Sequence, residues 1–251
     1  MKKNALIIGI RNEDSLCYFI AKELKKIGYE IYATYLNEQA RADVERVAKE
    51  IGIVKLYRYD ASLDEDLESF TEKFIEDGIK LDALVHGIAY SSDPGAKLNH
   101  SLLEVCMEEF GEAIRVGAFS LVEVVGKLIH QFNEEAGIIT LTSRLSRVAV
   151  PGYNVVGAAK AALDSIIRGL AQSLGDLKKI RVNGIAPGAV ATKSLAKIGN
   201  VLDILAEAKR RSPLKRNVAK EDVGRFAVMI LENTSLTGTI YSIDNGMDIM
   251  G

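Results

Sequence analysis

The alternation of apolar and polar segments along the chain predicts an α/β fold. Short, continuous apolar runs bounded by glycine or polar residues are typical of strands that are buried on both faces of a sheet. Such runs occupy residues 5–8, 31–35, 54–59, 81–86, 137–141, 180–185 and 239–243. Segments with helical periodicity separate them, at 15–28, up to residue 50, at 64–76, at 110–132 and after Tyr153. This alternation favours one Rossmann-type domain over residues 1–251, with three layers and a seven-stranded parallel sheet.

Polar and glycine residues gather at the predicted carboxyl ends of the strands. In open parallel sheets, ligands bind beyond these ends, where the strand order reverses. The residues at these ends are Gly9, Asp60, Gly87, Thr142, Ser143 and the Pro187-Gly188 turn. Their convergence predicts a dinucleotide site.

The first strand–helix turn departs from the GxGxxG pattern of many dinucleotide sites. It has one glycine, Gly9, and a serine six residues later, Ser15, which we expect to cap the following helix. A helix N-terminus with a serine hydroxyl can still bind a pyrophosphate.

Tyr153 and Lys160 are candidate catalytic residues. Their seven-residue spacing corresponds to two turns along one face of a helix, so the phenol and the ammonium would point into the same space. Such a pair can bind a carbonyl oxygen and donate to it as negative charge develops. The alternative is an interfacial tyrosine and a solvated lysine on an ordinary helix.

Composition narrows the function further. A net charge of −2 and 48% hydrophobic residues give no support for a nucleic-acid partner. The apolar run near the start is too short for a signal peptide or a membrane span. Two cysteines and the residues His86, His100 and His130 lack metal-ligand spacing, so we expect no metal site, a hydrogen-bonded core role for His86, and the cytoplasm as compartment.

Gly9-x5-Ser15-Leu16-Cys17 together with Tyr153-x6-Lys160 resembles the enoyl-acyl-carrier-protein reductases, a divergent branch of the short-chain dehydrogenase/reductase superfamily. The similarity extends to segments 84–89, 181–183, 221–224 and 243–247, and so covers essentially the whole chain. The superfamily's commoner Tyr-x3-Lys spacing occurs only at Tyr18 and Lys22, where we expect a structural pair.

The resemblance implies reduction of a 2-enoyl thioester by a reduced nicotinamide cofactor. Tyr153 and a cofactor ribose hydroxyl would stabilise the enolate oxygen, and Lys160 would bind the ribose. The resemblance also implies which residues contact the cofactor. Gly9, Ser15 and Leu16 would lie at the pyrophosphate, and Asp60 and Ala61 at the adenine. Gly87, Ile88 and Ala89 would lie at the adenosine and ribose, and Val190 and Thr192 at the nicotinamide carboxamide and the pyrophosphate. Thr142 belongs to the same cofactor side, at the position where other members of the superfamily have a serine that holds a substrate carbonyl.

NADH is the expected cofactor, and NADPH the alternative. A 2′-phosphate is usually bound by Arg or Lys just after the second strand. The segment Leu36-Asn37-Glu38 offers no cation there, although Arg41 lies one turn away.

The substrate side departs from the resembling family. Those reductases usually carry a second tyrosine ten residues before the first, and this chain has Ser143 there. The Pro187-Gly188 turn is also closer to the broader superfamily. Reduction of a ketone or oxidation of an alcohol, for example on a 3-oxoacyl thioester, is therefore the alternative reaction, and a non-catalytic dinucleotide-binding protein is a third reading.

Residues 191–216 are expected to form a substrate lid, with Leu195 against the acyl chain. Lys209, Arg210 and Arg211 in this segment would attract an acidic acyl carrier protein. A packed amphipathic helix with a solvated charged face is the alternative. The resemblance also implies a homotetramer that uses the helices near residues 110–132 and 153–175.

Overall fold

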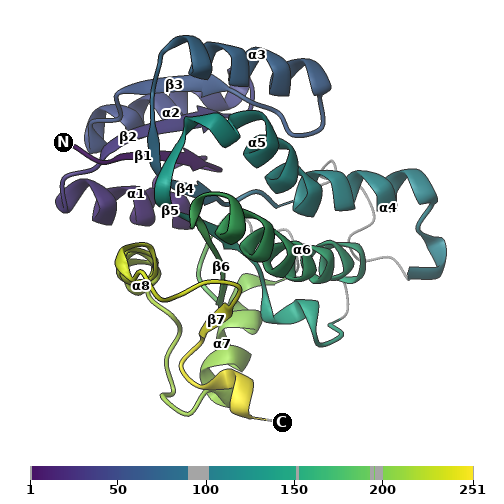
Figure 1. The fold of residues 1–251 in the computed structure, drawn as a ribbon. Coiled ribbons are helices and arrows are strands. Elements are labelled where there is room, and N and C mark those ends of the chain that lie inside the picture. Colours follow the sequence, from purple (N-terminus) through teal and green to yellow (C-terminus); the bar gives the residue numbers. More distant parts are fainter. Residues whose placement is uncertain (1, 90–101, 151–152, 193–194, 196–199, 251) are drawn as a thin grey trace.

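Seven parallel strands form one sheet in the order β3-β2-β1-β4-β5-β6-β7 (Figure 1). The computed structural model describes residues 2–89, 102–150, 153–192, 195 and 200–250. The strands are β1 (Asn4–Ile8), β2 (Glu30–Tyr35), β3 (Lys55–Arg58), β4 (Leu81–His86), β5 (Phe132–Leu141), β6 (Arg181–Pro187) and β7 (Ile240–Ile243). The order reverses between β1 and β4, and this point predicts where a nucleotide binds.

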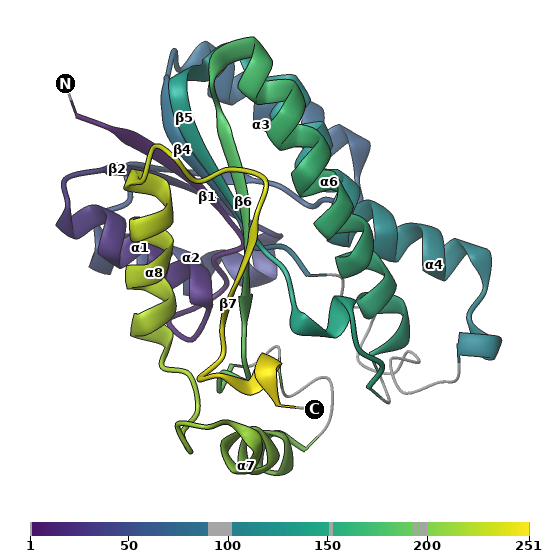
Figure 2. The same cartoon turned by 60° about the horizontal axis from the view of Figure 1, so that its bottom comes forward.

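Helices cover both faces of the sheet (Figures 1 and 2). The bounds are α1 (Leu16–Lys26), α2 (Glu38–Ile51), α3 (Asp64–Glu76), α4 (Met107–Ile114), α5 (Ser120–Leu128), α6 (Asn154–Lys178), α7 (Val201–Arg211) and α8 (Lys220–Glu232). One apolar cluster joins α1, α2 and α8 to the sheet, and a second joins α3, α5 and α6 to the opposite face. Figure 2 shows α7 beyond the carboxyl ends of β6 and β7. The predicted three-layer architecture is confirmed.

The helix predicted over residues 110–132 is interrupted. It begins as α4, passes through a π-helical turn at Arg115–Phe119, continues as α5 and ends in a 3-10 turn at Ile129–Gln131. The apolar periodicity continues through the turn and so gives no sign of it. A π turn inserts an extra residue, and here it sets the position of Ser120 opposite β4.

Strand β5 is longer than the predicted 137–141. It begins at Phe132, which pairs with Leu81, and the register shifts before Gly137 pairs with Ala83. Glu135 within the irregular part has a φ of 62°. The buried Phe132 and Ala136 hold this polar segment against the sheet, a tertiary effect that local propensity does not predict.

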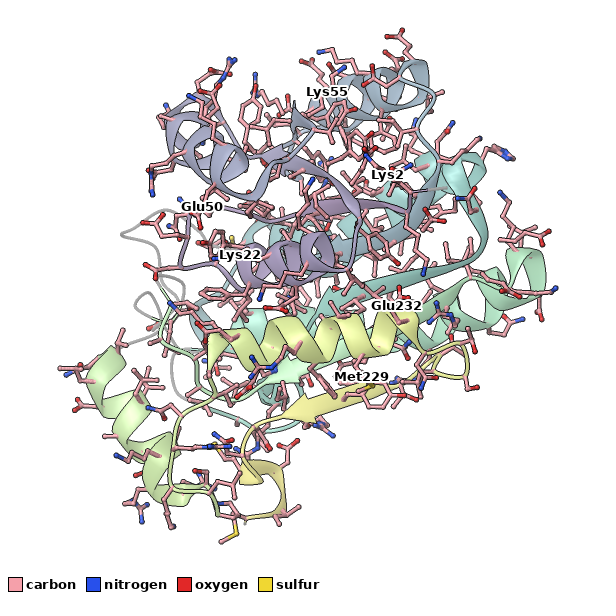
Figure 3. All side chains as sticks on the ribbon, turned by 90° about the vertical axis from the view of Figure 1, so that its left-hand side faces the viewer. Lys2, Lys22, Glu50, Lys55, Met229 and Glu232 are labelled. Atoms are coloured by element: carbon pink, nitrogen blue, oxygen red, sulfur yellow. The ribbon has the colours of Figure 1, made fainter. Side chains whose placement is uncertain are left out.

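The second Tyr/Lys pair lies between α1 and α2, with Tyr18 buried and Lys22 nearer the surface. The Lys22 ammonium donates to the Tyr18 hydroxyl at 3.0 Å and forms an ion pair with Glu50 of α2. Figure 3 labels Lys22 and Glu50 on this side of the molecule. Their place between two surface helices is that of a structural pair.

Candidate active site

The ends of β1 and β4 approach each other closely at two glycines. Gly9 has a φ of +107°, and a Cβ added to it would lie 2.5 Å from the carbonyl oxygen of Gly87. A Cβ on Gly87 would in turn lie 2.1 Å from the sulfur of Cys17. The backbone is therefore bare where a dinucleotide's phosphates pass between a strand and the next helix, and the residues present fit such a group.

Ser15 occupies the N-cap position of α1, but its side chain does not cap the helix. Its hydroxyl donates to the Asn12 carbonyl at 2.7 Å. The predicted N-cap position is therefore confirmed, although the hydroxyl binds within the turn before the helix and makes no capping hydrogen bond. The first backbone amides of α1, starting at Leu16, therefore donate no hydrogen bond to the Ser15 side chain.

Lys160 is buried, with 4% of its surface exposed. Its ammonium donates to the carbonyl oxygens of Ile88 at 3.0 Å and Leu141 at 2.9 Å, at the ends of β4 and β5. Burial lowers its pKa to about 8, and the neighbouring Asp164 opposes that shift. The solvated-lysine alternative is therefore wrong, since this cation lies inside the strand-end region where a ligand would bind.

Tyr153 lies at the N-cap position of α6 and is joined to Ser143 of the loop after β5. Ser143 accepts a hydrogen bond from the Leu145 amide at 3.1 Å, and its hydroxyl is also hydrogen-bonded to Tyr153. Burial raises the pKa of Tyr153, and the Ser143 hydrogen bond counteracts part of the rise. Tyr153 is thus protonated at neutral pH, and its hydrogen-bond partner Ser143 is itself bound by a backbone amide.

The hydroxyl of Thr142 is bound by an acid of α6. It donates to Oδ1 of Asp164 at 2.5 Å, and Ser146 donates to Oδ2 of the same carboxylate at 2.7 Å. Because the single hydroxyl proton of Thr142 is used, only its lone pairs are available to a ligand. Thr142 can accept from a cofactor or substrate but cannot donate to a carbonyl.

His86 is fully buried at the end of β4 and is a core residue, as predicted. The Ser120 hydroxyl donates to the Val116 carbonyl at 2.7 Å, so it can only accept from His86 Nε2 at 3.0 Å. His86 Nδ1 then accepts from Thr140 at 3.1 Å. Burial lowers the pKa of His86 to about 3, with a smaller contribution from Lys160, and the ring is neutral.

The remaining predicted contacts lie at the same edge of the sheet. Asp60 and Ala61 follow β3, where the Asp60 carboxylate accepts from the Ser62 amide at 2.9 Å. Val190 and Thr192 follow β6, and the Leu195 amide donates to the Thr192 carbonyl at 3.1 Å. Ala89 is exposed after β4.

A polar cavity of about 520 Å³ lies between the first turn and the start of α2. Its described lining residues are Arg11, Asn12, Asn37, Gln39, Ala40 and Asp43. Arg41 turns elsewhere, forming ion pairs with Glu38 at 3.2 Å and Glu45 at 2.7 Å and lying over the Tyr35 ring. Arg41 was the cation that kept NADPH as an alternative cofactor, and two carboxylates already neutralise its charge.

The predicted lid lies partly outside the described residues, which omit 193–194 and 196–199. Its described helix, α7, buries only Ala208, and Leu202 is 75% exposed. Val201, Ile204 and Leu205 on the same helix are half-buried, and the lid stays a prediction.

Asp164 belongs to this region although no functional motif indicated it, and Cys17, the small residue that ends the first motif, packs against Gly87. Asp164 follows Lys160 by four residues, a spacing that places both on one helix face. Within the described ranges, no group of three or more potential metal ligands occurs and no helix is long and apolar enough to span a membrane.

Comparison with known proteins agrees with this geometry. A family model described as enoyl-(acyl carrier protein) reductase matches residues 9–248. The chain belongs to this family. A Rickettsia felis enoyl-[acyl-carrier-protein] reductase [NADH] is 33% identical to it, over 99% of this chain and 95% of the relative.

Two solved structures of family members have the same fold. The Anaplasma phagocytophilum reductase in complex with NAD is 31% identical, with a TM-score of 0.90 over 99% of this chain and 93% of that one. The Bacillus cereus reductase with NADP+ and an indole naphthyridinone is 29% identical, with a TM-score of 0.93 over 99% and 97%. Because these relatives hold different dinucleotides, cofactor preference must be argued from this chain's own residues.

Proposed function

We propose that this protein reduces the 2,3 double bond of an enoyl thioester, with NADH as hydride donor. The observation that carries the proposal is the polarised chain from the Leu145 amide through Ser143 to Tyr153, beside the buried Lys160. NADH supplies the hydride that adds to the β-carbon. The thioester oxygen then gains negative charge, which a donor within hydrogen-bond reach stabilises.

Tyr153 is the proposed donor to that oxygen. In this proposal the Tyr153 oxygen accepts from Ser143, so the Tyr153 proton is directed at the substrate oxygen. Linked hydrogen bonds polarise one another, which makes Tyr153 a stronger donor. Lys160 is proposed to bind the ribose hydroxyls of the cofactor. Its ammonium is already held between two strand ends and needs little reorganisation to do so.

The competing ketone or alcohol chemistry is less well supported. A ketone reductase of this superfamily uses a hydroxyl at the Thr142 position to donate to the substrate carbonyl. Here that proton is committed to Asp164 at 2.5 Å. The non-catalytic reading is disfavoured because Tyr153 and Lys160 both have the surroundings that catalysis requires.

NADH is favoured over NADPH by the residues after β2. Leu36 and Asn37 supply no cation, Asn37 accepts from the Ala40 amide at 3.0 Å to cap α2, and Arg41 is paired with Glu38 and Glu45. A 2′-phosphate would meet no unpaired cation among these. We expect a lower KM for NADH, and an NADPH preference would contradict the assignment.

The decisive experiment follows NADH absorbance with crotonyl and acetoacetyl thioesters in parallel. Turnover of the crotonyl thioester supports the proposal. Turnover of acetoacetyl thioester alone would favour ketone reduction, and NADH binding without turnover of either would favour the non-catalytic reading.

We further propose an acyl carrier protein as the natural carrier of the substrate. The last turn of α7 and the next turn carry Lys209, Arg210, Arg211, Lys215 and Arg216, beyond the carboxyl ends of β6 and β7 (Figure 2). Charge reversal of Lys209, Arg210 and Arg211 should weaken turnover of a carrier-bound substrate more than that of a coenzyme A thioester. Reversal of Lys49 and Lys73, on α2 and α3, is the matched control, and equal losses on both substrates would contradict the carrier assignment.

A homotetramer and a cytoplasmic location complete the proposal. Exposed apolar residues on and after α4, namely Met107 at 77% and Phe119 at 48% exposure, are consistent with subunit contacts, and light scattering would test the assembly. Both cysteines are free thiols, as is usual in a reducing compartment.

A further inference from the structure

Asp164 is a buried acid at the centre of the site, with 7% of its surface exposed. Both of its oxygens are bound by hydroxyls of the segment after β5, Thr142 at 2.5 Å and Ser146 at 2.7 Å. Charge-assisted hydrogen bonds of this length are strong, and a buried carboxylate is costly without them. Asp164 therefore connects helix α6 to the loop that follows β5 at two points.

The loop held in this way contains Ser143, the residue that is hydrogen-bonded to Tyr153. The helix approaches the same loop closely at Gly157, where an added Cβ would lie 3.0 Å from the Leu145 carbonyl oxygen. The relative position of Ser143 and Tyr153 thus depends on contacts between the loop and α6, and Asp164 makes two of them.

Asp164 is also the acid nearest in sequence to Lys160 on α6. Cys17 of α1 and His86 of β4 are the other titratable groups near the ammonium, and Tyr153 stands at the N-cap of α6, seven residues before Lys160. Burial raises the pKa of Cys17 to about 12 and lowers that of His86 to about 3, and burial raises the pKa of Tyr153. These three are uncharged near pH 7, so Asp164 supplies the negative charge in this described part of the site.

We propose that Asp164 is a positioning residue that fixes the Ser143 loop on α6 and keeps the neighbouring Lys160 in its cationic form. The inference rests on the proposed function, since it assigns Lys160 to the cofactor and Tyr153 to the substrate. Burial alone pulls the pKa of Lys160 down toward neutrality, and the carboxylate one helical turn away counteracts that. Without that carboxylate, the pKa of Lys160 would fall further below its ordinary value.

The test is the pH dependence of NADH binding, measured by cofactor fluorescence between pH 6 and 10. Asp164→Asn keeps the size of the side chain but removes its charge. NADH affinity should be lost at alkaline pH, and the pH at which half of it is lost (the alkaline midpoint) should be about one pH unit lower in this variant. Asp164→Glu, which restores a carboxylate, should return the midpoint toward that of the unchanged protein. A midpoint unchanged in Asp164→Asn would overturn the electrostatic role.

The matched control is Asp248→Asn. Asp248 holds the same loop through Arg144 at 2.7 Å and Arg147 at 3.1 Å, but it does not contribute to the pKa of Lys160. It should leave the midpoint unchanged, whereas an equal shift would mean that loosening the loop, rather than the charge, is responsible.

A second pair of changes separates positioning from charge and serves if Asp164→Asn does not fold. Thr142→Val with Ser146→Ala removes both hydroxyl donors and leaves the carboxylate. We expect about a tenfold fall in kcat with crotonyl thioester and the alkaline midpoint unchanged. An unaltered kcat would overturn the positioning role. The failure of the unchanged protein to reduce crotonyl thioester would instead refute the proposed function, and the binding measurements would still decide the role of Asp164.

Discussion

Gly87 and Cys17 are predicted to be energetically coupled. Gly87 ends the turn after β4 without a positive φ, so its backbone accepts any L residue, and only the surrounding atoms oppose a side chain. In Gly87→Ala the new Cβ would lie 2.1 Å from the Cys17 sulfur, where contacts of roughly 3.5–4 Å are usual. Cys17 is 1% exposed and its sulfur lies 3.6 Å from the Ile8 carbonyl oxygen, so it has little room to move.

The expected magnitudes follow from this geometry. Overpacking by Gly87→Ala should lower the free energy of unfolding by about 1–3 kcal/mol. Cys17→Ala should lower it by about 1 kcal/mol, through loss of a buried sulfur. In the double variant the new methyl occupies the space of that sulfur, so the total loss should be close to that of Cys17→Ala alone. The coupling energy would then be about 1–3 kcal/mol.

Urea unfolding followed by circular dichroism measures all four proteins at one protein concentration, because assembly would otherwise alter the midpoint. Gly175→Ala is the control for adding a methyl to a glycine, since nothing lies within 4 Å of its added Cβ, and it should stabilise α6 slightly. Additive losses in the double variant would refute the steric reasoning and show that Gly87 is required for another reason.

Two further predictions concern single side chains. Tyr153→Phe should lower kcat for the enoyl thioester by about 10²–10⁴-fold while NADH affinity changes little, and full activity in this variant would remove Tyr153 from its assigned role. His86 has a folded-state pKa of about 3, below its ordinary value, so the unfolded state takes up the proton first and stability should fall as the pH drops below about 6.5. We expect a loss of about 2 kcal/mol between pH 7 and pH 5 in urea titrations, abolished in His86→Asn but kept when the exposed His130 is changed to Asn.

The strands could be predicted well because each is a short apolar run that is buried on both faces. The helix predicted over 110–132 was less accurate, because the π turn at Arg115–Phe119 interrupts it just before Ser120, whose hydroxyl is hydrogen-bonded to His86. The early start of β5 at Phe132 depends on pairing with Leu81, which is about fifty positions away in sequence. Both contacts join residues far apart in the chain, so neither produces a recognisable pattern in the local sequence.

The sequence predicted which residues belong to the candidate site better than it predicted the contacts that they make. Sequence spacing brought Tyr153 and Lys160 to one helix face, but it gave no sign that the ammonium would bind the carbonyls of Ile88 and Leu141. The i+4 spacing of Asp164 was visible in the sequence. Its two hydroxyl partners come from a loop about twenty residues earlier, so its role could only be inferred from the structure.

Ser143 bears most directly on how this chain departs from its relatives. A tyrosine at this position would bring a second phenol to the substrate, whereas Ser143 brings a hydroxyl that accepts from the Leu145 amide and is hydrogen-bonded to Tyr153. The Leu145 amide of the loop thus polarises Ser143. The position of Ser143 relative to Tyr153 therefore depends on how firmly that loop is held. Asp164 on one side and Asp248 on the other hold it through Ser146 and Arg144. The substitution of a large side chain by a small one is therefore compatible with the same chemistry only because the loop is fixed to α6 and to the C-terminal segment.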